Sequence, residues 1–396
     1  MSILLLTQVF PPKTGGSGRW LWELYRRLDN MDVHVIASDA PGSAEFDRRA
    51  PIPIFRMGLD FPSWGVAPWA GGTHYYQRLL EIRRIVAGVR PDEVHCGKCL
   101  PEGLLATLLK MQTGIPFVVY AHGEELMLAA TSGELRVLTR YVLRSAATVI
   151  ANSAHTQHLL TTTWHVPSAK VVIMHPGVDT SRFVPAPCDQ EIRGRLGWAN
   201  RRVILSVGTL QKRKGQDMMI RALPSIRARC PDALYVMVGE GLERSYLDNL
   251  VAEHGVEQAI QFRGVPSDDE LIECYQQCDL FALPNRQVGW DIEGFGIVFL
   301  EAQACGKTVI AGASGGAPET IKRSFTGEVV ACETPDHLAA VTADLLDNPE
   351  RRMLMGQHGR RRVVEHFDWG ILTSQACRLF MERRAPHDRA SEAPCH

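Results

Sequence analysis

Two glutamates, Glu293 and Glu301, lie at either end of a glycine loop and a short apolar run. We predict a helix over residues 297–304 that Gly306 ends, because the run is apolar and glycine readily closes a helix. A helix start leaves backbone N–H groups free, so a phosphate or diphosphate can bind there. Glu293 can then reach sugar or ribose hydroxyls, whereas Glu301 needs a partner if it is buried. The simpler alternative makes Glu293 a helix-entry acid and Glu301 a solvated residue.

Three consecutive cations, Lys212, Arg213 and Lys214, follow a predicted buried strand at residues 203–208. At the carboxyl end of a strand, cations can neutralise a diphosphate leaving group. A solvated basic loop without a ligand is the alternative.

Glycines form a second candidate phosphate cradle near the start of the chain. Gly15, Gly16 and Gly18 connect a predicted strand at residues 3–6 to a helix. This order of elements can hold a phosphate. A dinucleotide site is disfavoured, because Leu21 occupies the third position of the glycine fingerprint. A loop that needs glycine only for its turn remains the other alternative.

A histidine, His122, follows the predicted strand at residues 116–121. Open α/β sheets bind ligands at the carboxyl ends of their strands, so this histidine is a candidate for ligand contact. A hydrogen-bonded structural histidine is the alternative.

Two successive alternations of strand and helix must position these residues. The first begins at residue 3 and the second at residue 203 of a 396-residue chain. We therefore predict an α/β protein with two Rossmann-like, doubly wound domains facing each other across a cleft. The predicted parts are a first domain (1–182), a second domain (183–366), a last helix (367–384) and a tail (385–396).

An aromatic stretch at residues 59–76 is predicted to be irregular, with a helix following to Arg90. Its aromatic side chains can stack on sugars, contact a membrane surface or simply cover the core. Basic residues on the helix can add an interfacial surface for an anionic lipid, or form a solvated face. A further helical stretch is predicted over residues 336–362.

Composition excludes several classes of protein. The net charge of −1 and the interspersed acids and bases argue against nucleic-acid binding. Cysteines are scattered, and the lone pair Cys96 and Cys99 is a weak metal or redox signal, so we expect reduced thiols in a cytoplasmic protein. Residues 2–6 do not resemble a signal peptide, and no apolar run reaches about 18 residues.

The stretch from Asp291 to Glu301 resembles the Glu-x7-Glu signature of retaining, nucleotide-sugar-dependent glycosyltransferases of the GT-B type. It is most similar to family four, including the phosphatidylinositol mannosyltransferase-like members. The resemblance recurs from Thr7 to about Trp369 and includes the donor-phosphate motif at residues 213–217. Many relatives carry Arg where this chain has Thr209, and it stays open whether Lys212 or Arg213 replaces that cation.

The resemblance assigns roles by position. It implies that residues 1–182 form an N-terminal acceptor domain, that residues 183–366 form a nucleotide-sugar domain, and that the helix at 367–384 crosses back to the N-terminal domain. It implies catalytic roles for three residues: His122, Lys214 and Glu293. It implies substrate contacts for a larger set: Gly15, Gly16, Thr209, Arg213, Gly264, Val265, Phe295, Gly296, Ile297 and Glu301. Within these, Lys214 contacts the donor diphosphate, Glu293 the donor sugar and Glu301 the ribose, and Gly264 and Val265 lie against the nucleotide base. Gly15 and Gly16 lie near the acceptor, which either Glu124 or Glu125 can face.

The implied activity is transfer of a hexose, with mannose favoured, from a nucleoside diphosphate sugar to a hydroxyl of a lipid, glycan or small molecule. The resemblance implies a retaining, metal-independent enzyme without a cofactor, with GDP-mannose as the favoured co-substrate and peripheral contact with the inner face of the membrane. Two alternatives stay open. One is a GT-B phosphorylase or epimerase-like enzyme, and the other is a catalytically silent nucleotide-sugar-binding module.

Overall fold

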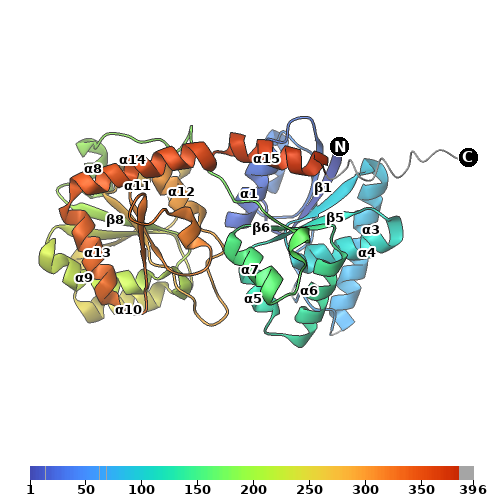
Figure 1. Cartoon of the computed structure of the whole chain (residues 1–396), viewed down its shortest axis with the longest axis horizontal. Helices are drawn as coiled ribbons and strands as arrows, with labels where there is room; N and C mark the ends of the chain where they lie inside the picture. The colour runs from blue at the N-terminus through green and yellow to red at the C-terminus, as the bar shows by residue number, and fades with distance from the viewer. Residues whose placement is uncertain (14, 62, 68, 383–396) are drawn as a thin grey trace, which may run out of the picture. The chain divides into compact units, whose positions relative to one another are not determined.

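Figure 1 shows the computed structural model, which describes residues 1–13, 15–61, 63–67 and 69–382. The chain divides into two compact units with separate hydrophobic cores. The first unit comprises Met1–Pro176 together with the segment that begins at Trp369, and the second comprises Gly177–Asp368.

The segment at residues 177–182 lies in the second unit, although the predicted boundary assigned it to the first. The backbone N–H of Val178 donates to the carbonyl of Phe367 at 2.9 Å. The Thr180 hydroxyl donates to the Asp368 carboxylate at 2.6 Å. These hydrogen bonds join the two ends of the second unit, which the local sequence pattern does not reveal.

The first unit contains a seven-stranded parallel sheet in the order β3-β2-β1-β4-β5-β6-β7. Its strands are β1 (Ser2–Thr7), β2 (Asp32–Ser38), β3 (Ile54–Met57), β4 (Glu93–Cys96), β5 (Phe117–Ala121), β6 (Thr148–Ala151) and β7 (Val171–Ile173). The strand order reverses direction between β1 and β4, the place where such sheets bind ligands. Leu6 pairs with Cys96 in register, so the segments after β1 and β4 leave the sheet together.

Helices cover this sheet, as its continuous apolar strands require. They are α1 (Gly16–Tyr25), α2 (Ser43–Arg49), α3 (Trp69–Val89), α4 (Leu104–Thr113), α5 (Glu124–Ala129), α6 (Gly133–Ser145), α7 (Ala154–Thr162) and α15 (Trp369–Glu382). Side chains of α3, α4 and α6 share one core with the sheet, and α15 packs against α1 (Figure 1). Short turns occupy Cys99–Gly103 and Ser168–Lys170.

The second unit contains a six-stranded parallel sheet in the order β10-β9-β8-β11-β12-β13. Its strands are β8 (Arg202–Val207), β9 (Ala233–Val238), β10 (Ile260–Phe262), β11 (Leu280–Leu283), β12 (Val309–Gly312) and β13 (Gly327–Val330). The order again reverses, here between β8 and β11. The loops after these two strands therefore meet at one edge.

Two helix layers enclose the second sheet. They are built from α8 (Gln190–Leu196), α9 (Gln216–Arg229), α10 (Arg244–His254), α11 (Asp268–Gln277), α12 (Ile297–Ala304), α13 (Pro335–Asp347) and α14 (Pro349–His366). Helices α9, α10 and α13 share one core with the sheet, and α8, α11, α12 and α14 share another. Short 3-10 turns occupy Lys212–Lys214, Glu257–Ala259 and Ala317–Thr320.

Two predicted elements differ from the structure. Helix α3 begins at Trp69, so part of the supposedly irregular aromatic stretch is helical. Within this stretch Tyr75 is buried and donates its hydroxyl proton to the Trp64 carbonyl at 2.8 Å, which favours the core-covering interpretation. The predicted helix over residues 336–362 is two helices, because Asn348 caps α14 and Pro349 starts it.

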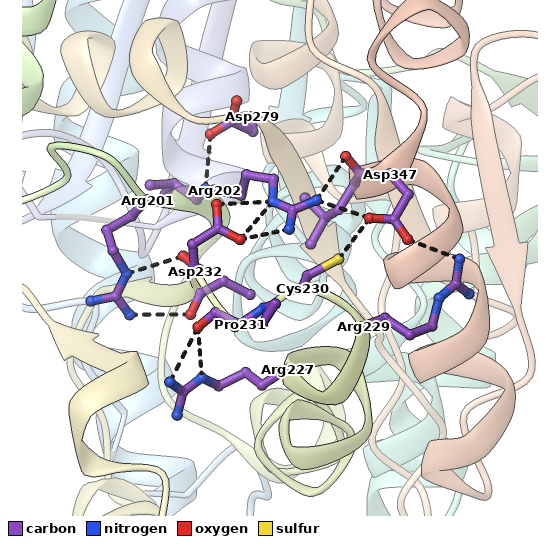
Figure 2. A network of polar contacts seen from close by, with 12 residues as sticks. Arg201, Arg202, Arg227, Arg229, Cys230, Pro231, Asp232, Asp279 and Asp347 are labelled. Atoms are coloured by element: carbon purple, nitrogen blue, oxygen red, sulfur yellow. Dashed lines mark hydrogen bonds and ion pairs between the residues drawn. The ribbon is translucent and has the colours of Figure 1, made fainter.

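A polar network ties together the end of the second sheet that lies away from the strand carboxyl ends (Figure 2). Arg202, the first residue of β8, donates to the Asp232 carboxylate at 2.6 and 2.8 Å. It also donates to Asp347 at the end of α13, at 2.9 Å. The thiol of Cys230 donates to the same Asp347 carboxylate at 3.1 Å. These contacts fasten β8, the start of β9 and α13 to one another.

Candidate active site

A buried ion cluster in the second unit contains three of the predicted site residues. One carboxylate oxygen of Glu293 accepts from the Lys214 ammonium at 2.5 Å and from the Arg213 guanidinium at 2.7 Å. The Arg213 Nε lies 2.9 Å from the Asp291 carboxylate. The structure thus joins the basic turn after β8 to the loop before α12, segments about 80 residues apart.

The two cations keep Glu293 ionised. Burial by itself raises the pKa of this carboxyl, but Lys214 and Arg213 outweigh that effect and lower the pKa below its ordinary value. Both basic side chains are also nearly buried. This part of the unit therefore concentrates charges that are paired with one another, at the strand end where a diphosphate is expected.

Close backbone packing holds the basic turn in place. Gly215 follows Lys214 with a φ of +76°, and a Cβ there would lie 1.9 Å from the carbonyl oxygen of Pro284. Only glycine fits this approach. The backbone N–H of Arg286 donates to the Arg213 carbonyl at 2.8 Å, so the loops after β8 and β11 are bonded directly.

The loop after β12 holds the backbone of Glu293. The N–H of Gly316 donates to the Glu293 carbonyl at 2.9 Å. A Cβ on Gly315 would lie 1.9 Å from that carbonyl oxygen, so the loop approaches closely because it is rich in glycine. The glycine-rich loop after β12 is therefore in direct contact with the Glu-x7-Glu segment.

Asn285 clamps the same loop, and the sequence interpretation missed it. This fully buried amide accepts from the N–H of Gly312 and donates to the carbonyl of Ser314, both at 3.0 Å. The available signal was a polar residue two positions after the end of β11. That signal was weak, because its partners lie almost thirty residues further along.

Helix α12 begins and ends where the sequence predicts, at Ile297 and Ala304. Gly296 precedes it with a φ of +90°, and Phe295 is buried. Ile297 is half-buried in the first turn. The Phe299 N–H donates to the Gly296 carbonyl at 3.1 Å, whereas the N–H groups of Ile297 and Val298 precede the first hydrogen bond of the helix and can bind an anion.

Glu301 is buried rather than solvated, so the helix-face alternative is wrong. Its carboxylate accepts a hydrogen bond of 2.7 Å from the hydroxyl of Tyr275, which is buried as well. Tyr275 is the partner that burial of the glutamate required. A contact of Glu301 with a ribose stays a prediction.

Arg213, and not Lys212, is the cation beside Lys214. The Lys212 ammonium lies over the ring of Tyr246, 5.9 Å from its centroid. Thr209 is exposed, and its carbonyl accepts from the Gln216 side chain at 3.2 Å. Arg213 is therefore the better candidate to compensate for the missing arginine at position 209.

The predicted base-binding residues follow β10. The Gly264 carbonyl accepts from the N–H of Gly239 at 2.7 Å, which joins this segment to the end of β9. Val265 is 70% exposed. An exposed apolar side chain is available to a planar base, and that role stays a prediction.

In the first unit, His122 lies at the end of β5. One ring nitrogen is 2.7 Å from the carbonyl of Gly97, and the ring packs edge-on against Trp20. The carboxylate of Glu125 accepts from the His122 N–H at 2.8 Å, so this glutamate is engaged locally while Glu124 is exposed. The histidine is thus a structured residue at a strand end, compatible with either interpretation.

The predicted glycine loop leads directly into α1. Gly15 precedes the helix, and its carbonyl accepts from the N–H of Arg19 at 3.0 Å. Gly16 is the first helical residue and has open space around its Cα. Both glycines are exposed, which leaves the start of this helix accessible.

Glu102 is a buried acid that the sequence interpretation also missed. One carboxylate oxygen accepts from the N–H of Gln8 at 2.7 Å, just beyond β1. Burial raises the pKa of Glu102 to about 7. It lies near the ammonium of Lys98, which donates to the Gln8 side chain at 2.8 Å. Glu102 therefore places a buried carboxyl group beside the carboxyl ends of β1 and β4.

The cysteine pair is buried. Cys96 ends β4 and Cys99 starts the next turn, and burial raises the pKa of both thiols well above the ordinary value. Thiols in this condition are poor nucleophiles and poor metal ligands.

Comparison with known proteins places the two halves in related families. Residues 14–182 match the family described as Glycosyltransferase Family 4, and residues 189–362 match the one described as Glycosyl transferases group 1. Anabaena HepE, solved in complex with UDP, has a TM-score of 0.80 at 21% identity, covering 96% of this chain and 100% of that one. Sucrose-phosphate synthase from Thermosynechococcus elongatus also has a TM-score of 0.80, at 20% identity, covering 98% and 100%. The two Rossmann-like domains define a GT-B fold.

Relatives that are similar in sequence indicate the family within this fold. A GDP-mannose-dependent alpha-(1-6)-phosphatidylinositol monomannoside mannosyltransferase of Mycolicibacterium smegmatis is 34% identical over 96% of this chain and 99% of the relative. A GDP-mannose-dependent monoacylated alpha-(1-6)-phosphatidylinositol monomannoside mannosyltransferase of Corynebacterium glutamicum is 34% identical over 93% and 95%. The chain belongs to the family-four glycosyltransferases.

The helices were also compared with the requirements of a membrane span. In the part of the chain that the structure describes, none is long and apolar enough to cross a bilayer.

Proposed function

We propose that this protein transfers mannose from GDP-mannose to a hydroxyl of a phosphatidylinositol mannoside, with retention of anomeric configuration. The observation that carries the proposal is the cluster of Lys214, Arg213 and Glu293 in a chain similar to such mannosyltransferases over nearly its full length. The donor nucleotide, the sugar and the acceptor all follow from the relatives.

Lys214 and Arg213 supply the charge that a diphosphate leaving group needs. Breaking the bond between the anomeric carbon and the diphosphate oxygen places negative charge on that oxygen, which two cations with little solvent around them stabilise. The N–H groups around Phe295 to Ile297 add donors from the start of α12. This assignment requires neither a metal ion nor a cofactor.

Retention follows from attack on the same face that the leaving group departs from. The acceptor hydroxyl forms its bond to the anomeric carbon and passes its proton to a diphosphate oxygen. The products are the new mannoside and GDP. We assign Glu293 and His122 to the hydroxyl groups of the donor sugar, and the region of Gly15 and Gly16 to the acceptor.

A lipid acceptor implies peripheral contact with a membrane, which we place at its inner, cytoplasmic face. Exposed Arg83 and Arg84 on α3, with exposed Tyr76 about two turns earlier, support this proposal. Flotation with vesicles containing phosphatidylinositol tests it. Failure of the protein to float with such vesicles would contradict membrane contact.

The activity is tested with purified protein, a panel of GDP and UDP hexoses, and phosphatidylinositol monomannoside as acceptor. We expect a dimannosylated lipid from GDP-mannose alone, with an alpha linkage established by NMR. Sugar phosphate formed from inorganic phosphate indicates a phosphorylase, and a free epimerised sugar nucleotide indicates an epimerase. GDP binding without any turnover indicates a silent binding module.

A further inference from the structure

Glu293 is paired with the two cations that we assign to the donor diphosphate. The same carboxylate oxygen accepts from Lys214 at 2.5 Å and from Arg213 at 2.7 Å. Exposure of the three side chains is only 9–12%. Strong ion pairs in so little solvent cannot persist unchanged while the same cations contact phosphate oxygens.

The charges of the cluster already balance. Lys214 and Arg213 carry two positive charges, and Glu293 and Asp291 carry two negative ones. A diphosphate added beside this neutral set brings an anion close to the buried Glu293 carboxylate, and such a like-charge contact is costly where solvent is scarce. The cost is removed when Glu293 turns away from the cations and the phosphate oxygens take its place.

We propose that Glu293 is an internal substitute for the donor diphosphate. It holds Lys214 and Arg213 in position, is exchanged for phosphate oxygens as the donor binds, and thereby becomes available to the hexose hydroxyls. This inference rests on the proposed function only for the identity of the anion. The Glu293 carboxylate therefore leaves the cations at the moment when the donor brings its sugar into the site.

The loop geometry allows the side chain to move without its backbone. The Glu293 carbonyl is held by the Gly316 N–H at 2.9 Å, and Gly315 packs against it. The exchange therefore takes place by rotation about the side-chain bonds and not by movement of the backbone. Asp291 differs, because its side chain is 46% exposed and pairs with Nε of Arg213 rather than with the atom that Glu293 contacts. It can keep Arg213 oriented while Glu293 leaves.

The exchange predicts that removing the Glu293 carboxylate strengthens anion binding, although the residue belongs to the site. Removing the Glu293 charge removes a competitor for the cations, so anions bind more tightly, whereas turnover falls because the sugar loses its carboxylate. A glutamate that merely positions Lys214 and Arg213 gives the opposite sign for anion binding. The two roles are therefore distinguished by affinity and turnover measured together.

The test uses calorimetric titration of the full chain with inorganic pyrophosphate and with GDP. We expect Glu293→Gln and Glu293→Ala each to bind both ligands about tenfold more tightly, with kcat lowered about 100-fold. The control, Asp248→Asn, removes a carboxylate from an exposed ion pair with Arg244 outside the cluster and should change affinity about twofold or less. Thermal unfolding confirms that each variant is folded.

A double variant decides whether the gain acts through the cation. In a Lys214→Ala background, Glu293→Gln should lose most of its gain in pyrophosphate affinity. Unchanged or weaker pyrophosphate binding by folded Glu293→Gln overturns the proposal, as does a gain that keeps its full size without Lys214. The pyrophosphate result stands even if the wild-type protein transfers no mannose, so failure of the proposed function is recognised separately.

Discussion

At the scale of single residues, the site depends on where each cation of the basic turn points. Lys214 contacts Glu293, whereas Lys212 lies over an aromatic ring. The two lysines have the same charge and are two positions apart in one short turn. Comparing substitutions of the two lysines therefore separates the role of Lys214 at the site from the general effect of positive charge in the turn.

Lys214→Ala is expected to lower kcat by about 100-fold or more, because a cation that stabilises the leaving group acts chiefly in the transition state. Steady-state transfer from GDP-mannose at saturating donor measures the loss. Lys212→Ala should retain turnover within about threefold of wild type. Equal losses in the two variants would contradict the assignment of Lys214.

At the scale of elements, loops after three strands of the second sheet interlock around the site. The turn after β8 bonds to the segment after β11, and Asn285 in that segment clamps the loop after β12. The clamped loop in turn holds the Glu293 backbone. The position of this catalytic candidate is therefore decided by contacts from outside its own motif.

Asn285→Ala leaves the Gly312 N–H and the Ser314 carbonyl without their buried partner, so we expect a stability loss of about 1–3 kcal/mol. Turnover should fall as well, because the loop that holds Glu293 is loosened. Melting temperature and kcat are measured together. Asn348→Ala, which removes the cap of α14, is the matched control: it costs about 1 kcal/mol and should spare kcat.

Asn285→Asp tests the same positioning role through the pH dependence of turnover. The substituted side chain, when ionised, can accept from Gly312 but cannot donate to the Ser314 carbonyl, whereas its protonated form can do both. Turnover relative to wild type should therefore rise as the pH falls. A flat ratio between about pH 5 and 8, like that expected for Asn348→Ala, would argue against a positioning role.

At the scale of the whole molecule, the second unit uses one end of its sheet for the candidate site and other contacts for stability. In the second unit the network around Arg202 lies at the starts of β8 and β9, away from the strand carboxyl ends (Figure 2). Arg202 holds the pKa of Asp232 below its ordinary value by hydrogen bonding. Stability and chemistry are therefore placed in different parts of this unit.

This network predicts part of the loss of folding stability at low pH. Because the folded-state pKa of Asp232 is lowered, its contribution is present above about pH 4 and is lost as the pH falls through the folded value. Asp232→Asn should lower stability at about pH 7 by at most about 1 kcal/mol, since the side chain is 39% exposed and solvent screens it.

Melting temperatures at about pH 7 and about pH 3 measure this contribution. The difference between wild type and Asp232→Asn should shrink at the lower pH, where protonation of the carboxylate removes the charge that the substitution also removes. Asp248→Asn, which removes an exposed pair within α10, serves as the control and should cost little at either pH. A difference of constant size would contradict an ionic origin.

Local sequence patterns were enough to predict the two α/β units, the bounds of α12 and the residues of the basic turn and the Glu-x7-Glu segment. Apolar strands, helical periodicity and glycine positions are readable without a structure, because each involves residues close together in the chain. The domain boundary, Tyr275 as the partner of Glu301, Arg213 as the cation beside Lys214, and the Asn285 clamp emerged from the three-dimensional fold alone. Each joins segments far apart in the chain, and local patterns do not specify which distant side chains meet.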